Sequence, residues 1–121
     1  MNRHGRTEVA WEDDIFVVHV AEAFNEDGLA FMFSRLKELI KSKDFTFWRR
    51  LEIWDEEVLG SPETIQIGKA IYAWYEENGC THTAVVVRNG VQEQIIRSIF
   101  KSGAKVFRNE EEAKEWLKSV G

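Results

Sequence analysis

The side chains that most often carry enzyme chemistry are few in this sequence. The single cysteine, Cys80, has no second cysteine for a Cys-x2-Cys metal pair, and the three histidines have no spacing such as His-x3-His: they are His4, His19 and His82. His82 follows Cys80 closely, but a nucleophile and its base must be positioned by the fold rather than by proximity along the chain. The glycine-rich phosphate-binding patterns and Gly-x-Ser-x-Gly are also absent. We therefore expect no enzyme, no metal and no cofactor.

An acidic stretch is the first candidate for a binding site. Asp55, Glu56 and Glu57 follow an apolar run and precede Ser61. Ser61 stands before Pro62, and this order is typical of a helix N-cap followed by the first helical turn. The hydroxyl of Ser61 is therefore predicted to accept a hydrogen bond from a helix amide, and a role as phosphoacceptor is the alternative.

A second candidate lies at Asn89 and Gly90, which open another predicted helix. The free amides of a helix N-terminus can bind an anion, and a plain turn is the alternative interpretation. The carboxyl ends of parallel strands meet at one edge of a sheet, so the loops over residues 54–61 and 88–91 are expected to lie close together there. That edge is the predicted binding site.

Aromatic residues make up 12% of the chain, and the five tryptophans are too many for the centre of so small a core: Trp11, Trp48, Trp54, Trp74 and Trp116. Trp74 lies off the apolar stripe of its helix, and Trp48 and Trp54 share the more polar face of their strand. These three residues are predicted to belong to an interface with a partner or a second copy. The alternative is that they cover the edge of the core.

Length, composition and charge limit the class of protein. A chain of 121 residues with 44% apolar residues suits one domain, over residues 1–121. The formal net charge of -5 argues against nucleic acid and anionic membranes as partners, because those surfaces are bound through clustered Lys and Arg. No apolar run predicts a signal peptide or a membrane-spanning helix, and one cysteine cannot form an intrachain disulfide, so we expect a cytoplasmic protein.

Hydrophobic periodicity predicts the elements that carry these residues. Five strands are expected, over residues 7–11, 15–23, 45–54, 83–87 and 105–108. The third of them alternates apolar with more polar residues, so one of its faces is expected to be partly exposed. Four helices are predicted to begin after Asn25, Ser61, Asn89 and Asn109. The order β-β-α-β-α-β-α-β-α predicts an α/β fold, with a five-stranded, mostly parallel sheet, an antiparallel first strand at its edge and four helices packed on it.

The chain ends with the stretch Val106-Phe107-Arg108-Asn109-Glu110-Glu111-Glu112-Ala113, followed by Trp116-Leu117. This stretch contains, in order, a helix cap, carboxylates at the positive end of the helix dipole and an apolar stripe. With this ending and the order of its elements, the chain resembles the STAS domains, typified by bacterial anti-sigma-factor antagonists, and in particular their small stand-alone relatives of uncharacterised role. The resemblance covers nearly the whole chain and implies the same fold.

STAS domains carry, where it is present, the regulatory motif Asp-Ser-Ser-Gly-Leu-Gly, in which a partner kinase phosphorylates a serine. The matching stretch here is Asp55-Glu56-Glu57-Val58-Leu59-Gly60, so glutamate occupies both serine positions. One hypothesis is that Glu56 or Glu57 supplies a permanent charge of about -1 where phosphate would supply about -1.5 to -2. The alternative is a solvated acidic loop before a helix.

The resemblance implies a non-catalytic regulatory module that binds a protein partner or a second copy of itself. The alternative function is a carrier of a small apolar ligand or lipid, since some relatives of this fold are thought to hold hydrophobic molecules between helices and sheet. In that case the predicted wall residues are Met32, Phe33, Trp74 and Tyr75.

Overall fold

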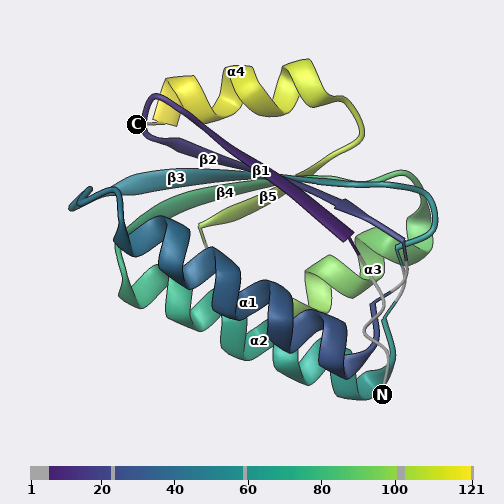
Figure 1. Ribbon diagram of the computed structural model, residues 1–121. Helices are drawn as coiled ribbons and strands as arrows, with labels where there is room; N and C mark the ends of the chain where they lie inside the picture. Colours follow the sequence, from purple (N-terminus) through teal and green to yellow (C-terminus); the bar gives the residue numbers. More distant parts are fainter. Residues whose placement is uncertain (1–5, 23, 59, 101–102, 121) are drawn as a thin grey trace.

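The computed structural model describes residues 6–22, 24–58, 60–100 and 103–120, in which strands and helices follow one another in the predicted order (Figure 1). The strands are β1 (Arg6–Glu12), β2 (Ile15–Ala21), β3 (Trp48–Trp54), β4 (Cys80–Val86) and β5 (Ala104–Phe107). The helices are α1 (Glu26–Lys41), α2 (Pro62–Glu77), α3 (Gly90–Ile99) and α4 (Glu110–Val120). The predicted α/β class is confirmed, and residue 23, at the end of the predicted second strand, lies outside the described residues.

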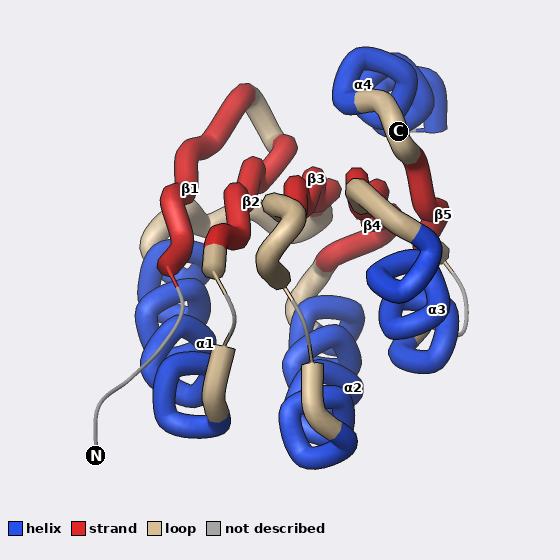
Figure 2. The backbone as a smooth tube through the Cα atoms, turned by 90° about the vertical axis from the view of Figure 1, so that its right-hand side faces the viewer, coloured by secondary structure: helices blue, strands red, loops and turns tan. Residues whose placement is uncertain are grey.

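The five strands form one sheet in the order β1-β2-β3-β4-β5. β1 pairs antiparallel with β2 at one edge, and every later pair is parallel, as predicted. Crossovers between parallel strands are right-handed, and each one here steps in the same direction across the sheet, so the three connecting helices fall on one face. Figures 1 and 2 show α1, α2 and α3 on that face and α4 on the other.

Each helix begins at a side chain that replaces a missing backbone hydrogen bond. The side-chain oxygen of each N-cap residue accepts a hydrogen bond from the backbone amide three residues later, at an N···O distance of 2.7 to 3.2 Å. The N-cap residues are Asn25, Ser61, Asn89 and Asn109. A cap of this kind contributes about 1 kcal/mol to stability. The caps also fix the first turn of each helix close to the strand that precedes it, and this sets the geometry of the loops between them.

The sheet divides the apolar core into two layers. The larger layer lies between the sheet and α1 to α3, and its most buried members include Phe16, Val18, Leu36, Trp48, Tyr75 and Ile96. The smaller layer lies under α4 and comprises Ile15, Leu51, Ile53, Ala84, Val86, Ala113 and Leu117. The central strands are therefore covered on both faces, which is the usual condition of parallel strands.

The third strand differs from its prediction. It begins at Trp48 rather than at residue 45, and Phe47, before it, is 69% exposed. The face expected to be partly exposed is buried, with Trp48 1% and Trp54 8% exposed. The charged residues between these tryptophans, Arg50 and Glu52, are buried because they pair with each other beneath two tyrosine rings of α2. The expectation that Trp48 and Trp54 reach the surface is therefore wrong.

Candidate functional site

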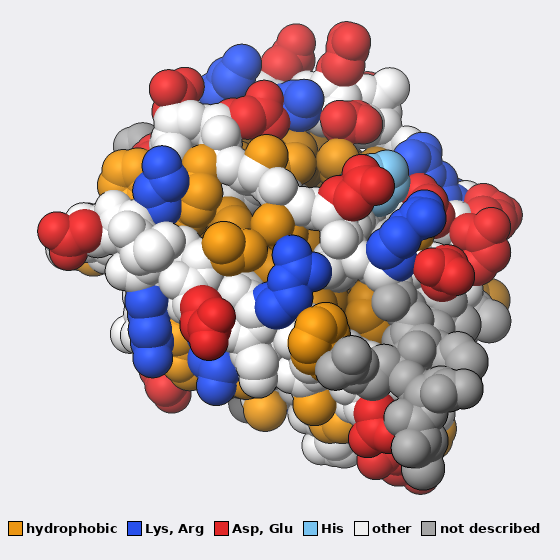
Figure 3. Space-filling model, viewed as in Figure 1, with side chains coloured by type: hydrophobic (Ala, Val, Ile, Leu, Met, Phe, Trp, Pro, Cys, Tyr) orange, Lys and Arg blue, Asp and Glu red, His pale blue; other side chains and the backbone are white. Residues whose placement is uncertain are grey.

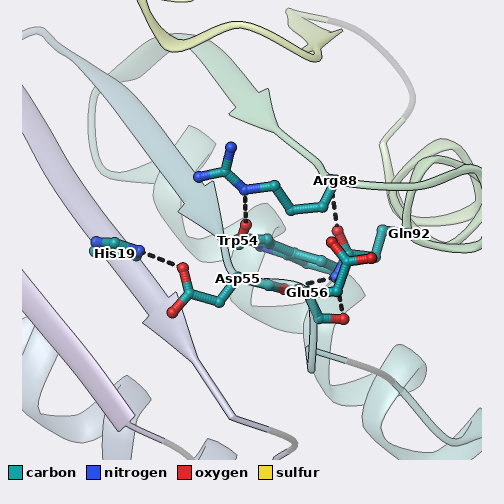
Figure 4. Close-up of polar contacts among 6 residues, drawn as sticks. All are labelled: His19, Trp54, Asp55, Glu56, Arg88 and Gln92. Atoms are coloured by element: carbon teal, nitrogen blue, oxygen red, sulfur yellow. Dashed lines mark hydrogen bonds and ion pairs between the residues drawn. The ribbon is translucent and has the colours of Figure 1, made fainter.

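The predicted binding edge is built around the loop that follows β3 (Figure 4). Gln92, in the first turn of α3, is fully buried. Its side-chain NH2 group donates to three backbone carbonyls of this loop, those of Asp55 (2.7 Å), Glu56 (3.4 Å) and Val58 (3.0 Å). Its oxygen accepts from the amide of Arg88 at 2.8 Å. One side chain therefore holds the loop against the start of α3 and satisfies carbonyls that have no strand partner.

The two loops of the predicted edge do meet, since the helix that Asn89 caps is the one that carries Gln92. Glu56 and Glu57 are exposed, so their carboxylates are open to a partner. Gly90 is also exposed, and Asn89 is partly buried. Ser61 begins α2 and uses its hydroxyl as an N-cap, which is the structural role that the sequence predicts for it.

A histidine and a carboxylate complete the edge. His19 Nε2 lies 2.7 Å from Asp55 Oδ1, with the side chains 43% and 35% exposed, and the pair joins β2 to the loop after β3. Arg88 donates from Nε to the carbonyl of Trp54 at 3.1 Å. In the described part of the chain, no three His, Cys, Asp or Glu side chains are grouped to hold a metal ion. Nor does that part contain a helix long and apolar enough to cross a bilayer.

Replacing Gln92 by leucine is expected to lower the free energy of unfolding by about 2 to 3 kcal/mol, because buried carbonyls lose their donor. Amide hydrogen exchange in residues 55–58 should accelerate more than exchange in β4. Gln94→Leu is the matched control, since Gln94 lies on the exposed face of the same helix. Equal exchange rates in the two variants would show that Gln92 does not hold the loop.

An apolar pocket of about 70 Å³ lies beneath this loop, between the sheet and the helices. It is lined by Val20, Phe24, Leu29, Met32, Glu52, Trp54, Val58, Gly60, Thr64, Ile65, Gly68, Ile71, Tyr72, Ile95 and Ile99. The loop after β3 and the first turns of α1 and α2 thus form part of its wall. The pocket and the predicted edge are one continuous site.

Of the four predicted wall residues, Met32 lines this pocket and the other three do not. Phe33 packs edge-on against Trp74 and Tyr75, with ring centroids 5.8 and 6.4 Å apart. These contacts place Phe33 and Trp74 between α1 and α2, whereas the Tyr75 ring also packs on the sheet against Trp48 and Arg50. The partly buried Trp74 also lies 6.0 Å from the ammonium of Lys41, a position that suits a cover for the edge of the core.

Among the described residues, the large hydrophobic side chains that are exposed differ from the predicted tryptophans: they are Phe31, Phe45, Phe47 and Val91. Figure 3 shows hydrophobic side chains reaching the surface between charged ones on one face of the molecule. For Phe45 and Phe47 the sequence signal of exposure is weak, because an aromatic residue before a strand is as compatible with burial as with exposure.

The rim of the apolar pocket is acidic. Val58 and Leu29 belong to the pocket wall, and exposed carboxylates precede each of them by one to three residues: Glu26, Asp27, Glu56 and Glu57. Figure 2 looks onto this end of the sheet, where α1 and α2 begin side by side. Acidic residues in a first helical turn are stabilised by the helix dipole, and they also leave a negative field around the pocket.

A buried polar cluster lies at the inner end of the pocket. Glu52 accepts hydrogen bonds from Arg50 Nη1 (2.8 Å), Trp54 Nε1 (2.8 Å) and the hydroxyl of Tyr72. The guanidinium of Arg50 lies over the rings of Tyr72 and Tyr75, 4.3 and 4.1 Å from their centroids. The pairing of Arg50 with Glu52 was not predicted from the sequence. Opposite charges two positions apart on a strand with both faces covered are the signal that predicts it.

Arg50, Tyr72 and Tyr75 keep their protons near neutral pH. Burial by itself lowers the pKa of Arg50, but the Glu52 carboxylate and the nearby phenol groups raise it by more, so the guanidinium stays protonated. Burial raises the pKa of both Tyr72 and Tyr75. Burial also raises the pKa of the Cys80 thiol, against the opposing effect of Arg50, and a protonated thiol is a poor nucleophile.

The order of the elements and the arrangement of the sheet are those of a STAS-like fold. No family model matches the chain, and no curated protein matches it. A solved structure that it resembles is an uncharacterized protein of the DUF3478 family with a SpoIIAA-like fold from Shewanella loihica PV-4. The two chains are 14% identical over 97% of each chain, with a TM-score of 0.66. At this identity the likeness confirms the predicted STAS-like fold alone.

Proposed function

We propose that the protein is a non-catalytic module that binds a basic protein segment, with one apolar side chain of the partner anchored in the pocket beneath residues 55–58. The observation that carries the proposal is an apolar pocket with an acidic rim at the carboxyl edge of the parallel strands. Ligand sites of open α/β sheets form at this edge. Peptide-binding sites often place a buried anchor inside a polar rim.

The size of the pocket favours an anchor side chain over a whole lipid. An apolar cavity of ~150 Å³ is large enough to hold benzene. The pocket here measures about 70 Å³, so it has room for the end of one aliphatic side chain. A lipid chain of ordinary length would need helices α1 and α2 to separate, and the aromatic contacts of Phe33 with Trp74 and Tyr75 oppose that separation.

Charge favours a basic partner. The chain carries a formal net charge of -5, and exposed carboxylates lie close in sequence to two wall residues of the pocket. Complementary charge speeds diffusional encounter and selects the partner, even where it adds little affinity. In this proposal Glu56 and Glu57 hold permanently the negative charge that a phosphorylated serine supplies reversibly in STAS domains.

The proposal is tested with an array of immobilised peptides in which one central residue is varied between flanking lysines. We expect labelled protein to prefer a central Leu, Ile or Met, and to bind more weakly as salt is raised. Ile95→Trp places a large ring in the pocket and should weaken binding at least about tenfold, since a hot-spot anchor is worth about 2 kcal/mol or more.

Val91→Trp is the matched control, because Val91 is 58% exposed and lies one helical turn before Ile95 without lining the pocket. Circular dichroism checks that both variants fold. Equal binding by Ile95→Trp and Val91→Trp, or an array with no preference for apolar central residues, would overturn the proposal.

A free small apolar molecule is the second candidate occupant, because nearly all the wall residues of the pocket are apolar. Native mass spectrometry of gently isolated protein separates the two functions. A co-purified mass that the wild type carries and Ile95→Trp lacks would favour the small ligand. A ligand-free mass together with peptide binding would favour the interaction module.

A further inference from the structure

Strand β1 forms an open edge of the sheet. It comes first in the sheet order, and the part of the chain that the structure describes places no further strand beside it (Figure 2). Its seven residues, Arg6–Glu12, pair with β2 without a register shift. The opposite edge is β5, which has four residues and carries an exposed lysine, Lys105. Short edge strands with lysine resist pairing with another chain, whereas a long and regular edge strand favours it.

The backbone groups at this edge follow from the pairing of β2. The carbonyl of Val20 accepts a hydrogen bond from the amide of Asp55 at 2.9 Å, so the even-numbered residues of β2 direct their backbone groups toward β3. The odd-numbered residues of β2 therefore bond to β1, where the register places even-numbered residues opposite them. Thr7, Val9 and Trp11 consequently direct their amides and carbonyls away from the sheet.

Apolar side chains accompany these backbone groups. Helix α1 is the helix nearest to the β1 edge (Figure 2). Phe33 of this helix contacts α2, and successive helical residues are about 100° apart, so Phe31 lies on the flank of α1 that faces away from α2. Phe31 is 44% exposed. Figure 3 views the molecule from the β1 edge and shows hydrophobic side chains between the charged ones on this face. A chain added to β1 would therefore contact apolar side chains as well as backbone groups.

We propose that this edge binds a second copy of the chain, whose β1 pairs antiparallel with it about a twofold axis at Val9. In this register Val9 faces Val9 of the second copy, and Thr7 faces Trp11 of the second copy, so the outward backbone groups of all three residues gain partners. Arg6 faces Glu12 of the second copy at both ends of the strand pair, and both side chains are exposed. Opposite charges in such cross-strand pairs stabilise the pairing.

The order of charges along β1 selects this register. The outward backbone groups are satisfied only where odd-numbered residues face odd-numbered residues. An axis at Glu8 would place Glu8 against Glu8 of the second copy, and an axis at Ala10 would place Glu8 against Glu12 at two positions. Like charges directly opposite each other are destabilising. The register at Val9 avoids both repulsions and pairs the whole length of the strand, so the strand is complementary to itself.

Sedimentation velocity of the full chain, between about 1 µM and 1 mM, measures the self-association. We expect a monomer–dimer equilibrium in the micromolar range, because the interface is small. Nuclear magnetic resonance reports the register in a sample that mixes isotope-labelled and unlabelled chains. An isotope-filtered spectrum should show a contact between the Hα atoms of Glu8 and Ala10 of different copies, since their Cα atoms are expected about 4.5 Å apart.

Charge variants test the register independently. Arg6→Glu and Glu12→Arg each place like charges opposite each other at both ends of the strand pair, and each should raise the dissociation constant about tenfold. The double variant Arg6→Glu/Glu12→Arg restores opposite charges and should return the constant to near its wild-type value. Circular dichroism checks that the variants fold. Lys105→Glu makes the same charge change as Arg6→Glu at the β5 edge, and this matched control should change the constant by less than about twofold.

A wild type that stays monomeric at about 1 mM would overturn the proposal, as would equal weakening by Lys105→Glu and Arg6→Glu. A double variant that fails to restore association would overturn the assigned register. No residue of β1 lines the apolar pocket, so Ile95→Trp should leave self-association unchanged. Failure of the dimer and failure of peptide binding are therefore distinguishable.

Discussion

Replacing Glu52 by leucine is expected to lower the free energy of unfolding by about 3 to 5 kcal/mol, because it leaves the charge of Arg50 buried and unpaired. Trp54 Nε1 and the hydroxyl of Tyr72 also lose their acceptor. Urea unfolding followed by circular dichroism measures the loss. The effect is large because three buried donors depend on this one carboxylate.

The double variant Arg50→Met/Glu52→Leu distinguishes an unpaired charge from a packing defect. Removing both charges should recover most of the lost stability, because a buried ion pair is worth little more than an apolar pair of similar volume. Glu93→Gln is the exposed control. It breaks pairs with Arg97 and Arg108 and should change stability by less than about 1 kcal/mol. A Glu52→Leu variant as stable as Glu93→Gln would contradict the buried pairing.

Replacing Trp48 by alanine is expected to cost about 3 to 5 kcal/mol, the usual loss for a large aromatic side chain removed from a core. The Trp48 ring packs edge-on against Trp11, Phe16 and Tyr75, with centroids 5.8 to 6.2 Å apart. Its Nε1 donates to the carbonyl of Asn78 at 2.8 Å. Urea unfolding again provides the measurement.

Trp74→Ala is the matched control, since this ring is only partly buried. It should cost clearly less than Trp48→Ala. The comparison also tests the sequence interpretation that placed Trp48, Trp54 and Trp74 in an interface. A Trp48→Ala variant that kept its stability and lost self-association or partner binding would restore the interface assignment.

The parts of the fold that depend on local signals were predictable from the sequence. The four helix caps act within three residues of their own position, and the element order follows from apolar spacing. The contact of residues 55–58 with the start of α3 was predictable because the loops after parallel strands lie together at the carboxyl edge of the sheet. Each of these inferences needs only short segments of the chain.

The polar interior was not predictable in the same way. The pairing of Arg50 with Glu52 depends on Tyr72 and Tyr75, which follow in the sequence some twenty residues later. These tyrosines cover a face of β3 that the alternation of apolar and polar residues predicts to be partly exposed. Gln92 holds the loop through hydrogen bonds to residues that lie 34 to 37 positions earlier in the sequence. The walls of the pocket come from several separate elements. Helices α1, α2 and α3 therefore had to be placed before Phe33 could be excluded and Ile95 included.

The strand order has a consequence for how the chain acquires its structure. Because each strand lies next to the one made just before it, no segment must be inserted between two others that have already paired. Pairing of this kind keeps each chain closure as short as one crossover helix allows, and a shorter closure costs less entropy. A nascent chain leaving the ribosome can therefore assemble its sheet progressively from the β1-β2 hairpin, and α4, which emerges after β5, closes the second face over Leu51 and Ala84.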